Sequence, residues 1–121
     1  MTNGIYYIIF KSYLGIIGDG LVVVDNGKVH GGDSRYLYRG TYKVDGTSIR
    51  AEIQVSYYRG TLKSVFGPLS KFELILSGNA PDESFTLSGH MPGRSQAAIT
   101  VEGQKQSDLA HRGSSCQAYR E

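Results

Sequence analysis

The residue types that bind metals or perform nucleophilic chemistry are few in this chain and lie far apart. His30, His90 and His111 are widely separated, and the single cysteine, Cys116, stands near the C-terminal end. A zinc site usually shows in a sequence as closely spaced pairs of cysteine or histidine ligands. These residues therefore predict no metal site, and no cofactor is expected.

Gly32-Asp33-Ser34 resembles the segment that carries the nucleophilic serine of trypsin-like proteases. Such a serine needs a histidine base and an orienting carboxylate, and a chain of 121 residues is too short for that fold and offers no suitably spaced partners. We expect Asp33 and Ser34 instead to cap a short helical turn within residues 32–36, since short polar side chains accept hydrogen bonds from nearby backbone amides.

Two further polar segments are interpreted as turns or bends. Asp82 and Glu83 are adjacent in turn-forming sequence, whereas a carboxylate pair for acid–base catalysis must face a common cleft. Gly18-Asp19-Gly20 precedes no helix, so it does not match a phosphate-binding loop, and a bulge in a strand is expected there. Because no set of catalytic side chains emerges, the sequence predicts a protein that is not an enzyme.

Tyrosine is abundant, with 9 residues, and several lie close together in the middle of the chain. Tyrosine suits a half-buried strand, so these side chains either line a ligand pocket or fill a core. Their alternation with polar residues favours the core. The residues that remain candidates for pocket lining are Tyr36, Tyr38, Tyr42 and Tyr57.

The strand pattern is clearest in residues 36–57. Residues 49–57 alternate strictly between apolar and polar side chains, which is the period of a strand with one buried face. Asp45-Gly46 stands between two such segments and predicts a β-hairpin with a type I′ turn. Asn26-Gly27 predicts a second two-residue turn for the same reason.

Segments of this kind recur along most of the chain, and no segment shows the 3.6-residue period of a helix. They predict an all-β fold, a single antiparallel up-and-down β-barrel of about eight strands with at most a short helical turn. Gly40 and Gly89 fall on inward positions, which favours a barrel, while the long connection at residues 59–70 keeps a two-sheet sandwich open. The residues expected inside are Ile49, Ile53, Val55, Phe72, Leu74, Leu76, Phe85, Leu87 and Ile99.

The domain organisation is expected to be simple: residues 1–102 form the barrel domain, and residues 103–121 form a polar C-terminal tail with a possible short helix near residues 107–112. The formal charge of only +2 and the absence of a basic stripe argue against direct contact with nucleic acid. A lone cysteine favours a reducing compartment, and no apolar segment is long enough for a membrane span. We therefore expect a cytoplasmic protein without a membrane partner.

Residues 3–102 resemble the GrlR family, small bacterial negative regulators of type III secretion. The motifs that carry the resemblance are NGIYYIIF, DGLVVVDNGKVHGGD, YRGTYKVDGTSIRAEIQV, FELILSGN and FTLSGH. The resemblance implies a lipocalin-like β-barrel that forms a homodimer and represses by binding a transcriptional activator protein. The acidic run through which family members act falls by position on residues 44–47, where Asp45 alone is acidic. Asp45 is thus the one partner-binding residue that the resemblance implies.

Two functions are consistent with these observations. The first is a dimeric regulatory protein that acts by protein–protein contact with a transcriptional activator. The alternative is a lipocalin-like barrel that binds a small apolar ligand inside, since eight strands enclose just enough space for side chains or for one small ligand.

Overall fold

The structure is a computed structural model, and it describes residues 1–12, 15–59, 71–91 and 94–110. Residues 60–70 of the predicted connection at residues 59–70 lie outside this part of the chain, as does the tail beyond residue 110, with His111 and Cys116. Eight β-strands are present, and the described residues contain no helix. The strands are β1 (Gly4–Ser12), β2 (Gly15–Asp25), β3 (Lys28–Gly32), β4 (Tyr36–Asp45), β5 (Ser48–Tyr57), β6 (Lys71–Asn79), β7 (Ser84–Met91) and β8 (Arg94–Ser107).

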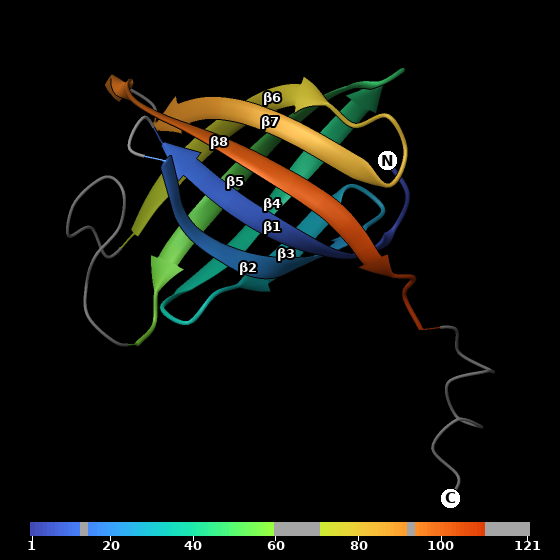
Figure 1. Ribbon diagram of the computed structural model, residues 1–121, viewed down its shortest axis with the longest axis horizontal. Coiled ribbons are helices and arrows are strands. Elements are labelled where there is room, and N and C mark those ends of the chain that lie inside the picture. Colours follow the sequence, from blue (N-terminus) through green and yellow to red (C-terminus); the bar gives the residue numbers. More distant parts are fainter. Residues whose placement is uncertain (13–14, 60–70, 92–93, 111–121) are drawn as a thin grey trace, which may run out of the picture.

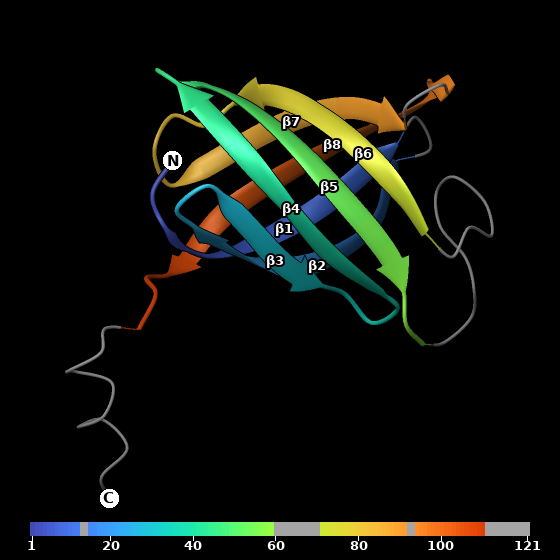
Figure 2. The ribbon, with the colours of Figure 1, turned by 180° about the vertical axis from the view of Figure 1, so that it is seen from behind.

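The eight strands form one closed antiparallel barrel (Figures 1 and 2). Each strand pairs with the next one along the chain, and β8 closes the sheet by pairing with β1. The prediction of an all-β, up-and-down barrel is confirmed, and the two-sheet alternative is excluded. A closed sheet has no edge strand, so every strand has a hydrogen-bonded neighbour on both sides.

Two tight turns show how the residues at a turn determine the position and type of a hairpin. Asn26 and Gly27 both have positive φ, at 48° and 86°, as a type I′ turn requires. The second turn differs from its prediction, because Asp45 still belongs to β4 and pairs with Ser48. The two central residues are Gly46 and Thr47, and only Gly46 has positive φ, at 66°. This is the pattern of a type II′ turn, in which glycine takes the first central position.

The alternating side chains of the strands fill the barrel with one apolar core. Of the nine residues predicted inside, all are buried except Phe72, which is half-buried and packs against the core at its margin. Val44, which shares its side of β4 with the buried Tyr38, is 40% exposed because it lies at the end of the strand, where the interior opens to solvent.

The two inward glycines, Gly40 and Gly89, lie where the backbone of a neighbouring strand comes very close. A Cβ atom at Gly40 would overlap the carbonyl oxygen of Glu52, and one at Gly89 would overlap that of Ile75. Glycine therefore allows neighbouring strands to approach closely at these two positions.

The last strand extends past the predicted end of the barrel domain. Residues 103–107 belong to β8 and pair with β1, so the barrel reaches Ser107 rather than residue 102. Gly103 faces inward beneath the ring of Phe85, and a side chain there would overlap that ring. A glycine at the inward position between polar outward residues hides the alternation that identifies a strand. The predicted short helix is not present in residues 108–110, and residues 111–112 lie outside the described chain.

The core assignment of β6 can be tested with Leu74→Ala. Leu74 is buried in the barrel centre, so its truncation should lower the free energy of unfolding by about 2–5 kcal/mol. Urea denaturation measures this, with Glu73→Ala, an exposed neighbour on the same strand, as the control that changes stability by less than about 0.5 kcal/mol. A similarly small effect for Leu74→Ala would contradict the inward placement of this strand.

The β4–β5 turn makes a second prediction. Gly46→Val should destabilise the fold by about 1–2 kcal/mol, because a side chain opposes the positive φ at this position. Thr47→Val is the matched control, since Thr47 is exposed and has no positive φ. Asp45→Asn should leave the thermal midpoint unchanged. Equal midpoints for both valine variants would show that φ at Gly46 does not limit the turn.

Candidate functional site

A small apolar cavity lies in the centre of the barrel. Its volume is about 70 Å³, and its wall contains no polar surface. A dry cavity lined only by apolar side chains accepts apolar guests and excludes water. The lining side chains are Met1, Ile8, Phe10, Val22, Val24, Val29, Tyr38, Tyr42, Ile49, Ala51, Ile53, Leu74, Leu76, Phe85, Leu87 and Val101.

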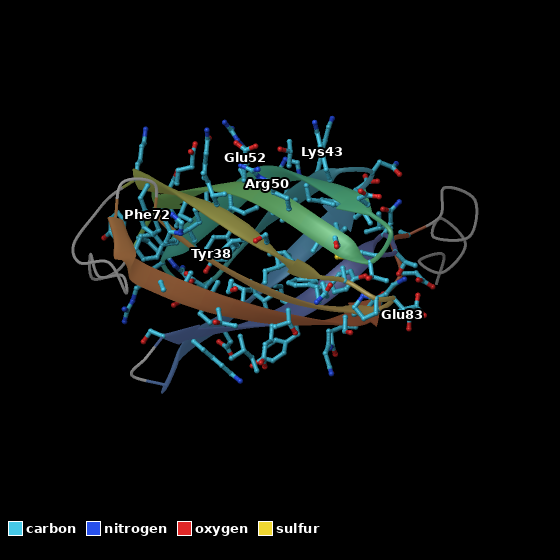
Figure 3. The ribbon with its side chains drawn as sticks, turned by 90° about the horizontal axis from the view of Figure 1, so that it is seen from above. Tyr38, Lys43, Arg50, Glu52, Phe72 and Glu83 are labelled. Atoms are coloured by element: carbon cyan, nitrogen blue, oxygen red, sulfur yellow. The ribbon has the colours of Figure 1, made fainter. Side chains whose placement is uncertain are left out.

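The four tyrosines predicted as pocket-lining residues divide into two pairs. Tyr38 and Tyr42 line the cavity. Tyr36 and Tyr57 do not line it; their ring centroids lie 5.9 Å apart in an edge-on contact. Tyr36 also contacts Phe72 edge-on, with centroids 6.2 Å apart. This aromatic cluster lies toward one end of the barrel, on the side where Figure 3 shows Phe72 and Tyr38.

Asp33 organises the same end of the barrel through four hydrogen bonds. Its Oδ1 accepts from the backbone amides of Arg35 and Tyr36 at 2.8 and 2.7 Å. Its Oδ2 accepts from the Tyr38 hydroxyl, and its carbonyl oxygen accepts from the Tyr58 hydroxyl at 2.7 Å. The predicted helical turn is absent, and Asp33 instead caps the β3–β4 connection while holding a tyrosine from β4 and another beyond β5.

The hydroxyl of Tyr38 is kept neutral by its surroundings. Burial raises the pKa of Tyr38 well above its ordinary value of 10.0, and the hydrogen bond to Asp33 raises it further. A phenol in this state neither accepts nor releases a proton near neutral pH. The Asp33–Tyr38 hydrogen bond therefore joins the β3–β4 connection to β4 at this end of the barrel.

The opposite end of the barrel is held by Lys105 and the first residues of the chain. Lys105 Nζ donates to Thr2 Oγ1 at 3.0 Å and lies 2.6 Å from Asp108 Oδ1. The Tyr6 hydroxyl donates to the Thr2 carbonyl at 2.7 Å. The hydrogen bond to Asp108 raises the pKa of Lys105, so the ammonium remains charged and ties the end of β8 to residue 2.

Asp45, the residue implied by the family resemblance, lies at the exposed end of β4. Its carboxylate forms no ion pair in the described part of the chain. It is far from the Asp33 end because β4 runs between them. The structure brings Asp45 together with none of the four candidate tyrosines: Tyr42 is on the same strand but faces the interior, whereas Asp45 is exposed.

The described residues show no arrangement for metal chemistry. His30 lies on the outside of β3 and His90 on the outside of β7, and no group of three or more metal-binding side chains occurs in residues 1–12, 15–59, 71–91 and 94–110. In the same part of the chain, no helix is long and apolar enough to cross a membrane.

A surface that the sequence prediction did not identify covers the outside of β1, β2 and β4. Tyr7, Leu21 and Leu37 are 37%, 52% and 50% exposed, although all three are large apolar residues. Three half-buried aliphatic side chains on β1 and β2 extend it. We call this surface the outer apolar face, which consists of Ile5, Tyr7, Ile9, Leu21, Val23 and Leu37. The signal was present in the sequence, because residues 5–10 are apolar at outward as well as inward positions.

No protein-family model matches this chain, and no curated protein matches its sequence. Membership of the GrlR family therefore stays a prediction from the quoted motifs. The fold and the outer apolar face are the observations from which a function must be argued.

The Asp33–Tyr38 contact predicts a stability change at alkaline pH. The pKa of Tyr38 is higher in the folded than in the unfolded chain, so its contribution is complete below about pH 10 and is lost as the pH rises above that value. Tyr38→Phe should lower the free energy of unfolding at pH 7 by about 1.5–3 kcal/mol, the range for a hydrogen bond to a charged group. It should also make the loss of stability above pH 10 less steep.

Tyr42→Phe provides the control for this measurement. Tyr42 lines the same cavity, and its hydroxyl forms no hydrogen bond among the described residues. Its removal should change stability by less than about 0.5 kcal/mol. The free energy of unfolding of both variants can be measured by chemical denaturation between pH 7 and 11. Equal losses of stability in Tyr38→Phe and Tyr42→Phe would contradict a stabilising hydrogen bond between Tyr38 and Asp33.

Proposed function

We propose that this protein is a non-enzymatic regulatory protein that acts by contact with another protein. The observation that carries the proposal is the outer apolar face, on which three large apolar side chains remain exposed outside a core that is already complete. Contiguous exposed apolar surface on a folded domain marks an interaction site. The resemblance to the GrlR family supports a transcriptional activator as the partner and the bacterial cytoplasm as the location.

The size of the cavity favours this function over binding of a small apolar ligand. Pockets that hold small molecules measure roughly 300–1,000 Å³, and the interior cavity measures about 70 Å³. An apolar cavity of about 150 Å³ holds one benzene molecule. Although the lining is suitably apolar, the side chains fill most of the barrel.

The charge distribution supports a protein partner rather than nucleic acid. On the outside of β4 and β5, Lys43 lies opposite Arg50, and Glu52 and Asp45 lie next to them on the same strands. Figure 3 shows Lys43, Arg50 and Glu52 pointing away from the barrel together. Alternating charges of this kind do not form the continuous basic stripe that phosphate binding requires.

The homodimer implied by the resemblance has to be reconciled with the closed barrel. Each of the eight strands has a hydrogen-bonded neighbour on both sides. A closed sheet therefore offers no free edge strand along which a second copy could add its own. A dimer would use an outer face of the sheet or the tail, and we keep the homodimer as part of the proposal.

The proposed function can be tested by capturing partners of the tagged full-length chain from its source cells after nuclease treatment. We expect a protein to be retained in stoichiometric amount, and that protein should lose its ability to bind DNA in a gel-shift assay when this chain is added. Retention of no protein beyond the level of an untagged control, or a shift of DNA by this chain alone, would contradict the proposal.

Asp45→Asn is the informative variant in the same experiment. An exposed carboxylate at the end of a strand contributes a screened contact of about 0–1 kcal/mol, so the variant should retain the partner to within about fivefold in affinity. A complete loss of binding would show instead that Asp45 carries the acidic contact of the family by itself.

A further inference from the structure

We propose that Asn26 is a site of spontaneous deamidation, at which asparagine is converted into aspartate and isoaspartate, and that the side chain of Asn3 controls the rate. The inference goes beyond the proposed function and does not depend on it. Three features support it: the sequence around the two asparagines, the hydrogen bonds between them, and the difference between the backbones that follow them.

The first feature is the sequence around the asparagines. The chain contains three asparagines, and two of them are followed by glycine, in Asn3-Gly4 and Asn26-Gly27. Asparagine is most prone to deamidation before glycine, because glycine has no side chain to hinder attack by its own backbone nitrogen. These two asparagines are 23 residues apart in sequence and are hydrogen-bonded to each other in the structure.

The second feature is a reciprocal pair of hydrogen bonds between these residues. Nδ2 of Asn3 donates to Oδ1 of Asn26 at 3.1 Å. In return, the backbone amide of Asn26 donates to Oδ1 of Asn3 at 3.0 Å. We call this contact between Asn3 and Asn26 the asparagine clasp. It holds both the side-chain amide of Asn26 and the backbone at the start of its turn.

Deamidation requires the side chain of Asn26 to leave this position. The Gly27 nitrogen attacks Cγ of Asn26 and forms a bond to it, while the bond from Cγ to Nδ2 breaks. Ammonia leaves with the proton of the Gly27 amide, and water then opens the cyclic imide at either carbonyl carbon to give aspartate or isoaspartate. Because Oδ1 is attached to the carbon under attack, the hydrogen bond from Asn3 opposes the rotation that brings Cγ to the Gly27 nitrogen.

The third feature is the backbone after each asparagine. The hydrogen bond that closes a β-turn joins its first and fourth residues, here Asp25 and Lys28, so it does not hold the Gly27 nitrogen. Gly4, by contrast, is buried and paired within β1. A buried backbone within a sheet opens less often than an exposed turn. Asn26, which is exposed, is therefore expected to react before the asparagine of Asn3-Gly4.

The two products have different effects on this end of the barrel. Aspartate at position 26 keeps an oxygen to which Asn3 can donate, and Asp-Gly suits a type I′ turn as Asn-Gly does. Isoaspartate adds one carbon atom to the main chain of a turn with only two central residues. The added atom disturbs the pairing of Asp25 with Lys28, so isoaspartate should loosen the β2–β3 hairpin and release Asn3.

The test follows both asparagines in the full-length chain at mildly alkaline pH, by peptide mapping with mass spectrometry and by enzymatic methylation of isoaspartate. Asn26 should react at least about tenfold more slowly in the folded chain than in urea, since the turn and the clasp must both open. Asn3→Ala removes the clasp and should raise the rate at Asn26 in the folded chain about three- to tenfold, the factor that corresponds to one net hydrogen bond.

Two aspartate variants test the clasp from each side. In Asn3→Asp the carboxylate still accepts from the Asn26 amide but cannot donate to Oδ1, so the reaction at Asn26 should again become faster. In Asn26→Asp the carboxylate accepts a charge-assisted hydrogen bond from Asn3, so the deamidation of Asn3 should become slower than in the wild type.

The matched control is Thr2→Ala. This variant loosens the same segment, because Thr2 Oγ1 accepts a hydrogen bond from Lys105, and it leaves the clasp in place. It should change the rate at Asn26 by less than about twofold. In urea, every variant that retains Asn26 should react there at the same rate, since positions 2 and 3 are not its neighbours in sequence. Circular dichroism should show that each variant is folded without urea.

Three results would overturn the inference. Equal rates at Asn26 in the folded wild type and in both variants of Asn3 would exclude control by the clasp. Equal acceleration by Thr2→Ala and Asn3→Ala would assign the effect to loosening of the whole segment. Absence of any conversion at Asn26 in the folded wild type and in folded Asn3→Ala, after the chain in urea has reacted completely, would exclude the site itself.

Discussion

The pairing of β8 with β1 is the constraint on which the rest of the structure depends. It turns a meander of hairpins into a closed sheet, in which every strand has a hydrogen-bonded neighbour on both sides. Because the sheet is closed, every inward side chain faces the same small interior and every outward side chain faces solvent or a partner. Gly103 makes this closure possible at the end of β8, since the ring of Phe85 occupies the space that a side chain would need.

Closure also limits the space inside the barrel. Side chains from all eight strands line the central cavity, which has a volume of about 70 Å³. One end is held by the hydrogen bonds of Asp33 and the other by Lys105 with Thr2. The outer apolar face lies on the outside of this closed sheet, so its side chains are not part of the core.

The sequence predicted the hairpins and the inward faces, because these depend on neighbours along the chain. Asn26-Gly27 adopts the expected turn, and Leu74 and Leu76 face the core as their alternation indicates. It predicted the β4–β5 turn one residue too early, since both Asp45-Gly46 and Gly46-Thr47 allow a positive φ at the glycine. It ended the barrel too soon, because the inward Gly103 interrupts the alternation of β8.

The amino-acid sequence by itself determined the strand period, the turns and the all-β class, since each follows from side-chain alternation and backbone preference within a few residues. Only the tertiary structure decided which residues meet across strands. Tyr7 and Leu37 are distant in sequence and belong to one cross-strand row because three antiparallel pairings fix their register. In the same way, Asp33 meets Tyr58 across 25 residues. Such contacts are set by strand register and barrel closure, which depend on all eight strands at once.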